Sequence, residues 1–313
     1  MFFDDYPQFF ETSQVFAHRG RLNLRYEAIF AANRDIFEGA RVLDLASHDG
    51  RWSFAALRTG ATHVTGIEAR ETAVDRARET FAHYGEDPES YRFVCGDIFD
   101  VLGNEKFDVD VVLCLGYLYH TYRHTELLRR IRDLEPNHVI VDTNVVPRVE
   151  QPFVKLFVDR AHKPGEAALD AYSHEDKTLV GRPSAPALRM MLQAYDFEVE
   201  HTYDWDALRA AHPEVDKLGD YADGKRVTMR CRSGVSASTA EPPAASAVSG
   251  GPTEQPPPGP SLATNGSQGR DLTQAGKTSA QSSSGGRWRH LVNRGLVKAT
   301  GYELRRVRPS RRD

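Results

Sequence analysis

The chain has 313 residues, of which 40% are hydrophobic, so it can bury a sizeable core. No apolar run approaches the roughly 20 residues of a membrane-spanning helix, and the acidic N-terminus does not resemble a secretory signal. We therefore expect a cytoplasmic protein. Its three cysteines are widely spaced without a C-x-x-C pair, which argues against both a disulfide framework and a cysteine zinc site.

Charge is distributed unevenly along the chain. The net charge is −4, but residues 287–313 contain eight Arg and one Lys against two acidic residues, a net +7, so residues 1–286 carry −11. Affinity for nucleic acid depends largely on Lys and Arg that neutralise phosphates. An acidic body therefore makes nucleic acid an unfavourable partner for this part of the chain.

Residues 1–40 form an N-terminal lead-in that begins with aromatic side chains. Its apolar residues then recur at helical spacing, and Gly39 stands where a helix would end. The pattern predicts one helix, with these residues on its apolar face: Leu24, Ala28, Ile29, Ala32 and Ile36.

Residues 41–232 alternate between apolar β-type runs and helical segments. The runs lie at 42–45, 63–67, 91–95, 109–115 and 138–146, and helical segments at 71–85 and 125–135 lie between some of them. Nearly continuous apolar strands separated by helices indicate an α/β fold, in which helices cover both faces of a parallel sheet.

The alternation is interrupted at residues 147–183, where we expect an insertion on the substrate side that contains a single strand. A helix capped by Ser184 follows, with four residues on one face, and two further β-type runs at 197–205 and 225–232 should complete the sheet. The four residues are Leu188, Met191, Leu192 and Tyr195.

Two segments follow the α/β region. Residues 233–286 are mostly Ser, Ala, Pro, Gly, Thr and Gln, which predicts a flexible linker. Residues 287–313 regain apolar side chains at helical spacing and predict a basic amphipathic helix. Two interpretations of this helix remain open: it docks on the acidic body, or it binds an anionic membrane surface or a protein partner.

Acidic residues and a glycine follow the first three predicted strands in order. The stretch VLDLASHDGRWSF reads as strand, tight turn and helix, with Asp44 on the strand and Gly50 in the turn. Glu68 ends the second strand, where a carboxylate can accept both hydroxyls of a ribose, and Asp97 follows the third, where an adenine would lie. Helix N-termini at the ends of parallel strands are typical cofactor sites.

With these positions, residues 20–232 resemble the class I S-adenosylmethionine-dependent methyltransferases. The family loop D-x-G-x-G-x-G corresponds to residues 44–50, in which Ala46 and His48 replace the first two glycines. The D-G-x-x-S-F segment at 49–54 is similar to the branch that contains the tRNA wobble-uridine carboxymethyltransferase-like group. The resemblance implies a Rossmann-like, doubly wound and mostly parallel seven-stranded sheet with an antiparallel final strand. It also implies S-adenosyl-L-methionine as cofactor.

The resemblance further implies a set of site residues. His120, in a G-x-L-Y-H segment, becomes the leading general base for an acceptor hydroxyl, and His48 is a second-rank candidate. The cofactor-binding residues would be Asp44, Ala46, His48, Gly50, Glu68, Asp97, Ile98 and Leu115.

Other roles remain open for the residues around His120. His120 could instead cap or pack a helix, and together with His124 it could form half of a metal site, although we expect no metal. Tyr117 and Tyr119 are read as cavity wall, and Asp142 fixes a loop or contacts substrate.

Missing motifs narrow the function. The chain lacks the Asn-Pro-Pro-Tyr or Asp-Pro-Pro-Tyr segment of N-methylating relatives and a cysteine motif for cytosine methylation. We therefore expect O-methylation of a small molecule or glycan. The alternatives are methyl or carboxymethyl transfer to a tRNA wobble uridine, and a cofactor-type fold that serves only as an interaction module.

Overall fold

The structure, a computed structural model, describes residues 1–12, 18–163 and 165–234. Apart from residues 233 and 234, the predicted linker at 233–286 lies outside the described residues, as does the whole tail at 287–313. No helix in the described part of the chain is long and apolar enough to cross a membrane.

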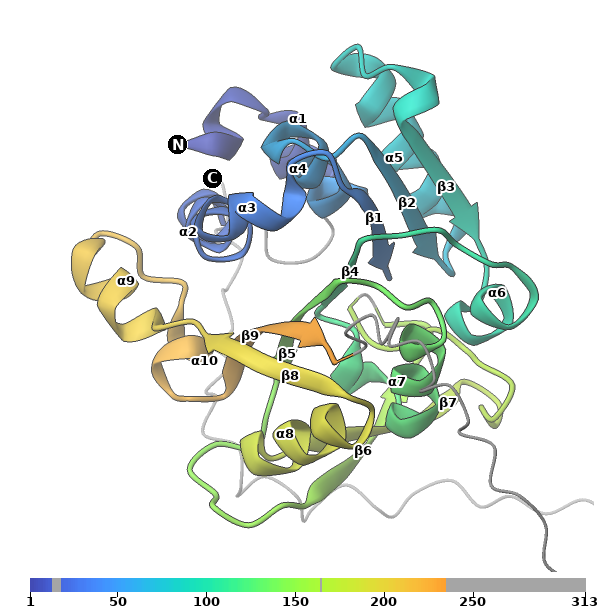
Figure 1. The fold of residues 1–313 in the computed structure, drawn as a ribbon, viewed down its shortest axis with the longest axis vertical. Coiled ribbons are helices and arrows are strands. Elements are labelled where there is room, and N and C mark those ends of the chain that lie inside the picture. The colour runs from blue at the N-terminus through green and yellow to red at the C-terminus, as the bar shows by residue number, and fades with distance from the viewer. Residues whose placement is uncertain (13–17, 164, 235–313) are drawn as a thin grey trace, which may run out of the picture. The chain divides into compact units, whose positions relative to one another are not determined.

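A seven-stranded sheet in the order β3-β2-β1-β4-β5-β9-β8 forms the centre of the fold (Figure 1). The first five strands pair in parallel, whereas β9 is antiparallel to both β5 and β8. This confirms the predicted sheet, including its antiparallel final strand. The strands are β1 Arg41–Leu45, β2 His63–Glu68, β3 Tyr91–Cys95, β4 Val111–Leu115, β5 His138–Asn144, β8 Phe197–Thr202 and β9 Arg226–Ser233.

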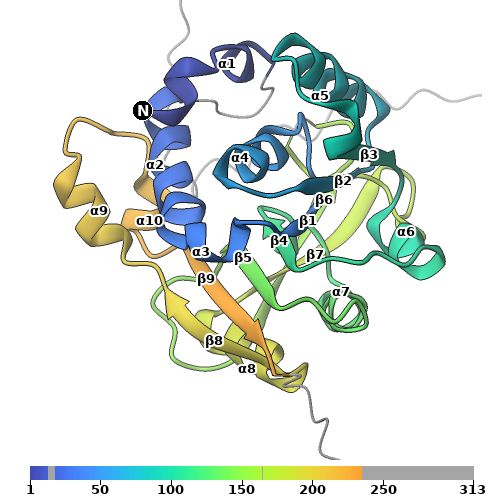
Figure 2. The same cartoon turned by 45° about the horizontal axis from the view of Figure 1, so that its top comes forward.

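Helices cover both faces of the sheet and create two hydrophobic cores (Figure 2). Because side chains alternate along a strand, Val42 joins α2, α4 and α5 in one core, while Leu43 joins α6, α7 and α8 in the other. The α-helices are α1 Gln8–Thr12, α2 Arg19–Ile29, α3 Arg34–Phe37, α4 Arg51–Thr59, α5 Glu71–His83, α6 Ile98–Asn104, α7 His124–Arg132, α8 Ala185–Ala194, α9 Trp205–Ala211 and α10 Gly219–Ala222. The 3-10 helices are η1 Phe2–Asp5, η2 Ala31–Asn33, η3 Pro88–Ser90 and η4 Leu118–His120.

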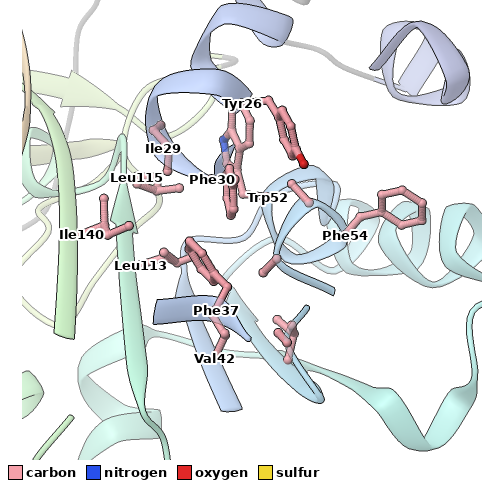
Figure 3. Close-up of a cluster of buried hydrophobic side chains, with 14 of the residues drawn as sticks. Tyr26, Ile29, Phe30, Phe37, Val42, Trp52, Phe54, Leu113, Leu115 and Ile140 are labelled. Atoms are coloured by element: carbon pink, nitrogen blue, oxygen red, sulfur yellow. The ribbon is translucent and has the colours of Figure 1, made fainter. Parts of the chain in front are cut away.

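Aromatic rings join the N-terminal helix α2 to α4, the first helix after β1. Figure 3 shows Phe30 beside Trp52, and their ring centroids lie 5.8 Å apart in a stacked arrangement. Tyr26 of α2 stacks on Phe2, near the start of the chain, with their ring centroids 3.8 Å apart. Stacked aromatic pairs add about 0.5–1.5 kcal/mol to the stabilisation from burial. The first residues of the chain therefore pack into the same core as the sheet.

The predicted lead-in helix is broken into three pieces. Helix α2 ends at Ile29 because the amide of Asn33 donates hydrogen bonds to the carbonyl oxygens of Ala28 and Ile29, at 3.2 and 3.0 Å. These bonds replace the partners that a continuing helix would supply. Ala32, predicted to lie on the apolar face, is exposed, whereas Gly39 follows the last piece with a φ of 75° as expected.

The insertion at 147–183 contains two strands rather than the one predicted. β6 (Val154–Arg160) and β7 (Lys177–Pro183) form a separate antiparallel pair. Its outer face leaves three apolar side chains 47–57% exposed: Leu156, Val158 and Leu179. Since only one face of this pair is covered, its strands lack the continuous apolar character that identified the strands of the main sheet.

A single buried carboxylate, that of Asp142 on β5, connects distant segments of the chain. It accepts hydrogen bonds from the guanidinium groups of Arg25 and Arg226, at 2.8 and 2.6 Å, and from the hydroxyls of Tyr221 and Thr228, at 2.8 and 2.6 Å. Burial alone would raise the pKa of Asp142, but the two guanidinium charges and the hydrogen bonds lower it well below its ordinary value. Asp142 thus fixes α2, α10 and β9 to the end of β5.

We predict that Asp142→Ala lowers the free energy of unfolding by about 3–5 kcal/mol at pH 7, because two buried guanidinium groups lose their counterion. Tyr221→Phe removes one neutral donor and should cost about 1 kcal/mol. Since the pKa of Asp142 is lower in the folded state, its stabilisation is present above about pH 4 and decreases as pH falls further. Urea titrations at several pH values measure both effects. Equal losses for the two variants at pH 7 would contradict the role of Asp142.

Candidate functional site

A cavity of about 610 Å³ lies beyond the carboxyl ends of β1, β2 and β4. Residues of α2, of the loops after these strands and of β6 and β7 line it. Ligands of open α/β sheets bind at this edge, next to the point where strand order reverses. The cavity brings together seven of the predicted site residues: Ala46, His48, Glu68, Asp97, Ile98, Leu115 and His120.

The loop after β1 keeps a glycine-type backbone without the glycines. Ala46 and His48, which occupy the positions of the first two family glycines, have φ values of 58° and 53°. Residues other than glycine rarely adopt this left-handed backbone conformation, and each one lowers the stability of the fold by about 1–3 kcal/mol. The loop conformation is therefore maintained by surrounding contacts and not by local preference.

Glu68 supplies one of these contacts. Its Oε2 accepts a hydrogen bond from the backbone N–H of His48 at 3.1 Å, and its Oε1 accepts one from the N–H of Arg70 at 2.9 Å. The side chain is only 5% exposed. Each carboxylate oxygen retains a second acceptor position. Glu68 can therefore hold the loop and accept two hydroxyls of a ligand simultaneously.

Asp44 and Gly50, also predicted as cofactor contacts, are not among the residues that line the cavity. The Asp44 carboxyl accepts a hydrogen bond from the hydroxyl of Ser53 on α4 at 2.7 Å, and burial raises its pKa to about 7. Gly50 has a φ of 76°, and a Cβ there would lie 2.9 Å from Cζ of Phe93 and 3.0 Å from Phe81. The close approach that requires Gly50 is thus to the aromatic core, and Asp44 fixes strand to helix.

Asp97 and Ile98, which follow β3, line another part of the cavity. Asp97 is the N-cap of α6 and accepts hydrogen bonds from the N–H groups of Phe99 and Asp100, at 2.8 and 3.2 Å. Burial raises its pKa. Ile98, which follows β3, and Leu115, at the end of β4, line the cavity with apolar side chains that are 4% and 7% exposed. An apolar wall beside a capping carboxylate suits a planar heterocycle with an exocyclic amine.

Unsatisfied polar atoms gather at the cavity. The described part of the chain has seven buried side-chain polar atoms without a hydrogen-bond partner, and four of them belong to cavity residues. These four are Arg25 Nε, Ser47 Oγ, His48 Nδ1 and Arg182 Nε. His48 Nδ1 lies 3.6 Å from Asp49 Oδ1, which is too long for a hydrogen bond. Buried groups of this kind need a partner, so their location indicates a polar ligand.

Arg25 is a cavity residue that the sequence did not identify. Its guanidinium lies 4.6 Å from the ring centroid of Trp52 and contacts Asp142 through Nη2. Only its position at the predicted start of the lead-in helix could have drawn attention to it, because the contacts that define it come from residues 27 and 117 positions away.

His120 lies at the end of η4, and its Nδ1 is 2.6 Å from Oδ2 of Asp159 on β6. Both side chains are largely buried, with 18% and 15% exposed. Burial alone would raise the pKa of Asp159, but the hydrogen bond with His120, the N–H of Ala167 and the charge of Arg182 lower it, so the carboxylate is ionised at neutral pH. Asp159 therefore fixes the ring with a proton on Nδ1 and leaves Nε2 as the acceptor nitrogen. The sequence did not reveal Asp159, which lies 39 residues from its partner.

The remaining candidates have structural surroundings. His124 is buried, and its Nε2 is 3.0 Å from the carbonyl oxygens of both Leu118 and Gly181, while burial lowers its pKa. Tyr117 and Tyr119 line the cavity, as predicted. Among the described residues, no group of three or more His, Cys, Asp or Glu side chains is arranged to hold a metal ion.

Comparison with known proteins agrees with this geometry. Residues 42–135 match a protein family described as "Methyltransferase domain". This match and the strand order support the class I S-adenosylmethionine-dependent methyltransferases as the class of the domain, and S-adenosyl-L-methionine as its cofactor.

One curated relative matches part of the chain. "Probable histone-arginine methyltransferase 1.4" of Arabidopsis thaliana is 34% identical over 143 residues, which make up 44% of this chain, and the match spans only 26% of that protein.

Two solved structures resemble the chain at low identity. A methyltransferase from Mesorhizobium loti that is S-adenosylmethionine dependent has 19% identity and a TM-score of 0.45, with 67% of this chain and 99% of that chain covered. The 1,6-didemethyltoxoflavin-N1-methyltransferase of Burkholderia thailandensis has 18% identity and a TM-score of 0.47, with 74% and 85% covered.

Gly50 and Gly39 offer a matched test of the loop. Both have positive φ, but a Cβ at Gly39 would meet nothing within 4 Å. Gly39→Ala should therefore cost about 1 kcal/mol of stability from backbone strain alone. Gly50→Ala adds a collision with Phe93 and Phe81 and should cost about 2–5 kcal/mol. Denaturant titration of both variants measures the difference, and similar losses would show that Gly50 does not approach the aromatic core.

Proposed function

We propose that this protein transfers a methyl group from S-adenosyl-L-methionine to a hydroxyl of a small molecule or saccharide. The His120–Asp159 pair in the wall of the cavity is the observation that carries this proposal. A hydroxyl is a poor nucleophile until it loses its proton, so its methylation benefits from a general base in a way that methylation of a neutral amine does not.

The residues around the cavity fit the proposed cofactor. Glu68 can accept hydrogen bonds from the two ribose hydroxyls. The apolar side chains of Ile98 and Leu115 suit the adenine ring, and Asp97 can accept a hydrogen bond from the adenine amine. Arg25 Nε, buried without a partner, suits the carboxylate of the methionine part. These residues lie on α2 and around the ends of β2 to β4.

When bound, S-adenosyl-L-methionine supplies a methyl group on a sulfonium and leaves as S-adenosyl-L-homocysteine. His120 Nε2 takes the proton of the acceptor hydroxyl as the new oxygen–carbon bond forms and the carbon–sulfur bond breaks. Asp159 stabilises the imidazolium that results, because its carboxylate already bonds Nδ1. His120 is thus the proposed catalytic residue, and Asp159 positions it.

The cofactor assignment predicts that Glu68→Ala weakens binding of S-adenosyl-L-homocysteine about 10- to 100-fold, because hydrogen bonds to a charged acceptor are lost. Titration calorimetry measures this. Glu198→Ala is the matched control, since the Glu198 carboxylate is exposed and does not line the cavity. Absence of binding by the wild type would refute the proposed cofactor, and equal affinity in Glu68→Ala would refute the role of Glu68.

The base assignment predicts that His120→Ala lowers turnover about 10²- to 10⁴-fold. The affinity for S-adenosyl-L-homocysteine should stay within about twofold, because His120 acts on the acceptor. Turnover is measured as transfer of labelled methyl from S-adenosyl-L-methionine to the acceptor fraction of a cell extract.

Asp159→Asn tests the pair independently. The substitution keeps the size of the side chain but removes the charge that stabilises the imidazolium, so turnover should fall while the cofactor still binds. Turnover close to wild type in both variants would return His120 to a structural role.

A further inference from the structure

Arg182 on β7 is part of the cavity wall. In the β6–β7 pair it stands directly opposite Lys155, on the same face as Asp159 and Thr178, which also line the cavity. Its guanidinium carbon lies 4.7 Å from the ring centroid of Phe157 and 5.9 Å from that of Tyr119. These two rings hold the planar group in place on the side of the cavity that η4, β6 and β7 form, called the acceptor side below because it contains His120.

Arg182 differs from the other arginines of the cavity in making no direct ion pair with a carboxylate of the described residues. Arg21 pairs with Asp220 at 2.6 Å, and Arg25 and Arg226 share Asp142. Within residues 1–12, 18–163 and 165–234, no carboxylate lies within 4.0 Å of the Arg182 guanidinium, and its buried Nε has no hydrogen-bond partner. The charge of Arg182 acts on the Asp159 carboxylate without a direct contact, so the buried Nε still needs a hydrogen-bond acceptor, which a bound ligand can supply.

The position of Arg182 relative to the proposed base is also informative. The ring of Tyr119 lies 4.1 Å from the ring of His120, and both Arg182 and Arg226 approach this same ring, at 5.9 and 5.7 Å. Arg226 and Arg25 together have one carboxylate between them, that of Asp142. The guanidinium of Arg182 therefore lies on the same side of the cavity as His120, where the Asp159 carboxylate is already bonded to His120 Nδ1 and to the N–H of Ala167.

We infer that the acceptor bears an anionic oxygen group, a carboxylate or a phosphate, which Arg182 binds while a neighbouring hydroxyl of the same molecule reaches His120. The inference rests on the proposed methyl transfer and narrows its substrate class. A guanidinium presents a planar pair of donors that fits either anion. The distance between anion and hydroxyl in the acceptor is then set by the spacing between β7 and η4.

The test uses the full chain with labelled S-adenosyl-L-methionine and a small-molecule extract, followed by separation on an anion exchanger at neutral pH. Labelled product that the resin retains supports the inference. Because methylation of a hydroxyl leaves the anion intact, phosphatase treatment of the retained product then distinguishes a phosphate from a carboxylate. Labelled product that is neutral or cationic would overturn the inference while leaving the proposed methyl transfer in place.

Variants connect the anion to Arg182. With the retained acceptor fraction, Arg182→Gln should lower kcat/KM about 10- to 100-fold, mainly through KM, and leave the affinity for S-adenosyl-L-homocysteine unchanged. Arg182→Lys keeps the charge but not the paired donors, so its kcat/KM should lie between those of the wild type and Arg182→Gln. Arg189→Gln is the control, because Arg189 is exposed on α8 outside the cavity. Equal kcat/KM in Arg182→Gln and wild type would overturn the assignment.

A second measurement does not depend on turnover. Inorganic phosphate, added to the protein saturated with S-adenosyl-L-homocysteine, should raise the melting temperature of the wild type by about 2 °C over sodium chloride of equal ionic strength. Arg182→Gln should lose this increase, and Arg189→Gln should keep it. The same increase in all three proteins would overturn the anion site, whereas failure to bind S-adenosyl-L-homocysteine at all refutes the proposed function itself.

Discussion

The buried carboxylate of Asp142 is the interaction on which both the fold and the cavity depend. It lies near the end of β5, and its Oδ1 binds Arg25 from α2 and Arg226 from β9, so segments from the start and the end of the described chain meet at one oxygen atom. Both arginines also line the cavity. The ionic contact that closes the fold therefore also holds two guanidinium groups of the cavity lining in place.

A second dependence concerns the loop after β1. Its left-handed residues Ala46 and His48 are strained, and the N–H of His48 is held by Glu68, the residue that we assign to the ribose hydroxyls. In the proposed assignment, one carboxylate therefore both holds the loop and accepts the ribose hydroxyls. The loss of two glycines from the family pattern is tolerated because a neighbouring strand enforces the conformation that glycine would otherwise adopt freely.

The sequence predicted what depends on local pattern. Apolar runs identified the strands of the main sheet, and the acidic residues at strand ends led to Glu68 and Asp97, which the structure places in one cavity. It did not predict Asp159, Arg25 or Arg182, because their roles come from contacts between distant segments. The contact of Gly50 with the aromatic core has the same origin: a glycine in the sequence shows that something approaches closely, but not that the approaching group is Phe93.

The β6–β7 pair has a consequence for how such a site diversifies. Its inner face carries Asp159 and Arg182, whereas the residues assigned to the cofactor lie in α2 and around the ends of β1 to β4. In the proposed mechanism, the carboxylate that orients His120 and the guanidinium that binds the acceptor anion are therefore both encoded in one contiguous segment outside the main sheet. Replacement of that segment would change which acceptor is recognised, but it would also remove Asp159, which orients His120. A replacement segment would therefore need a carboxylate at the same place.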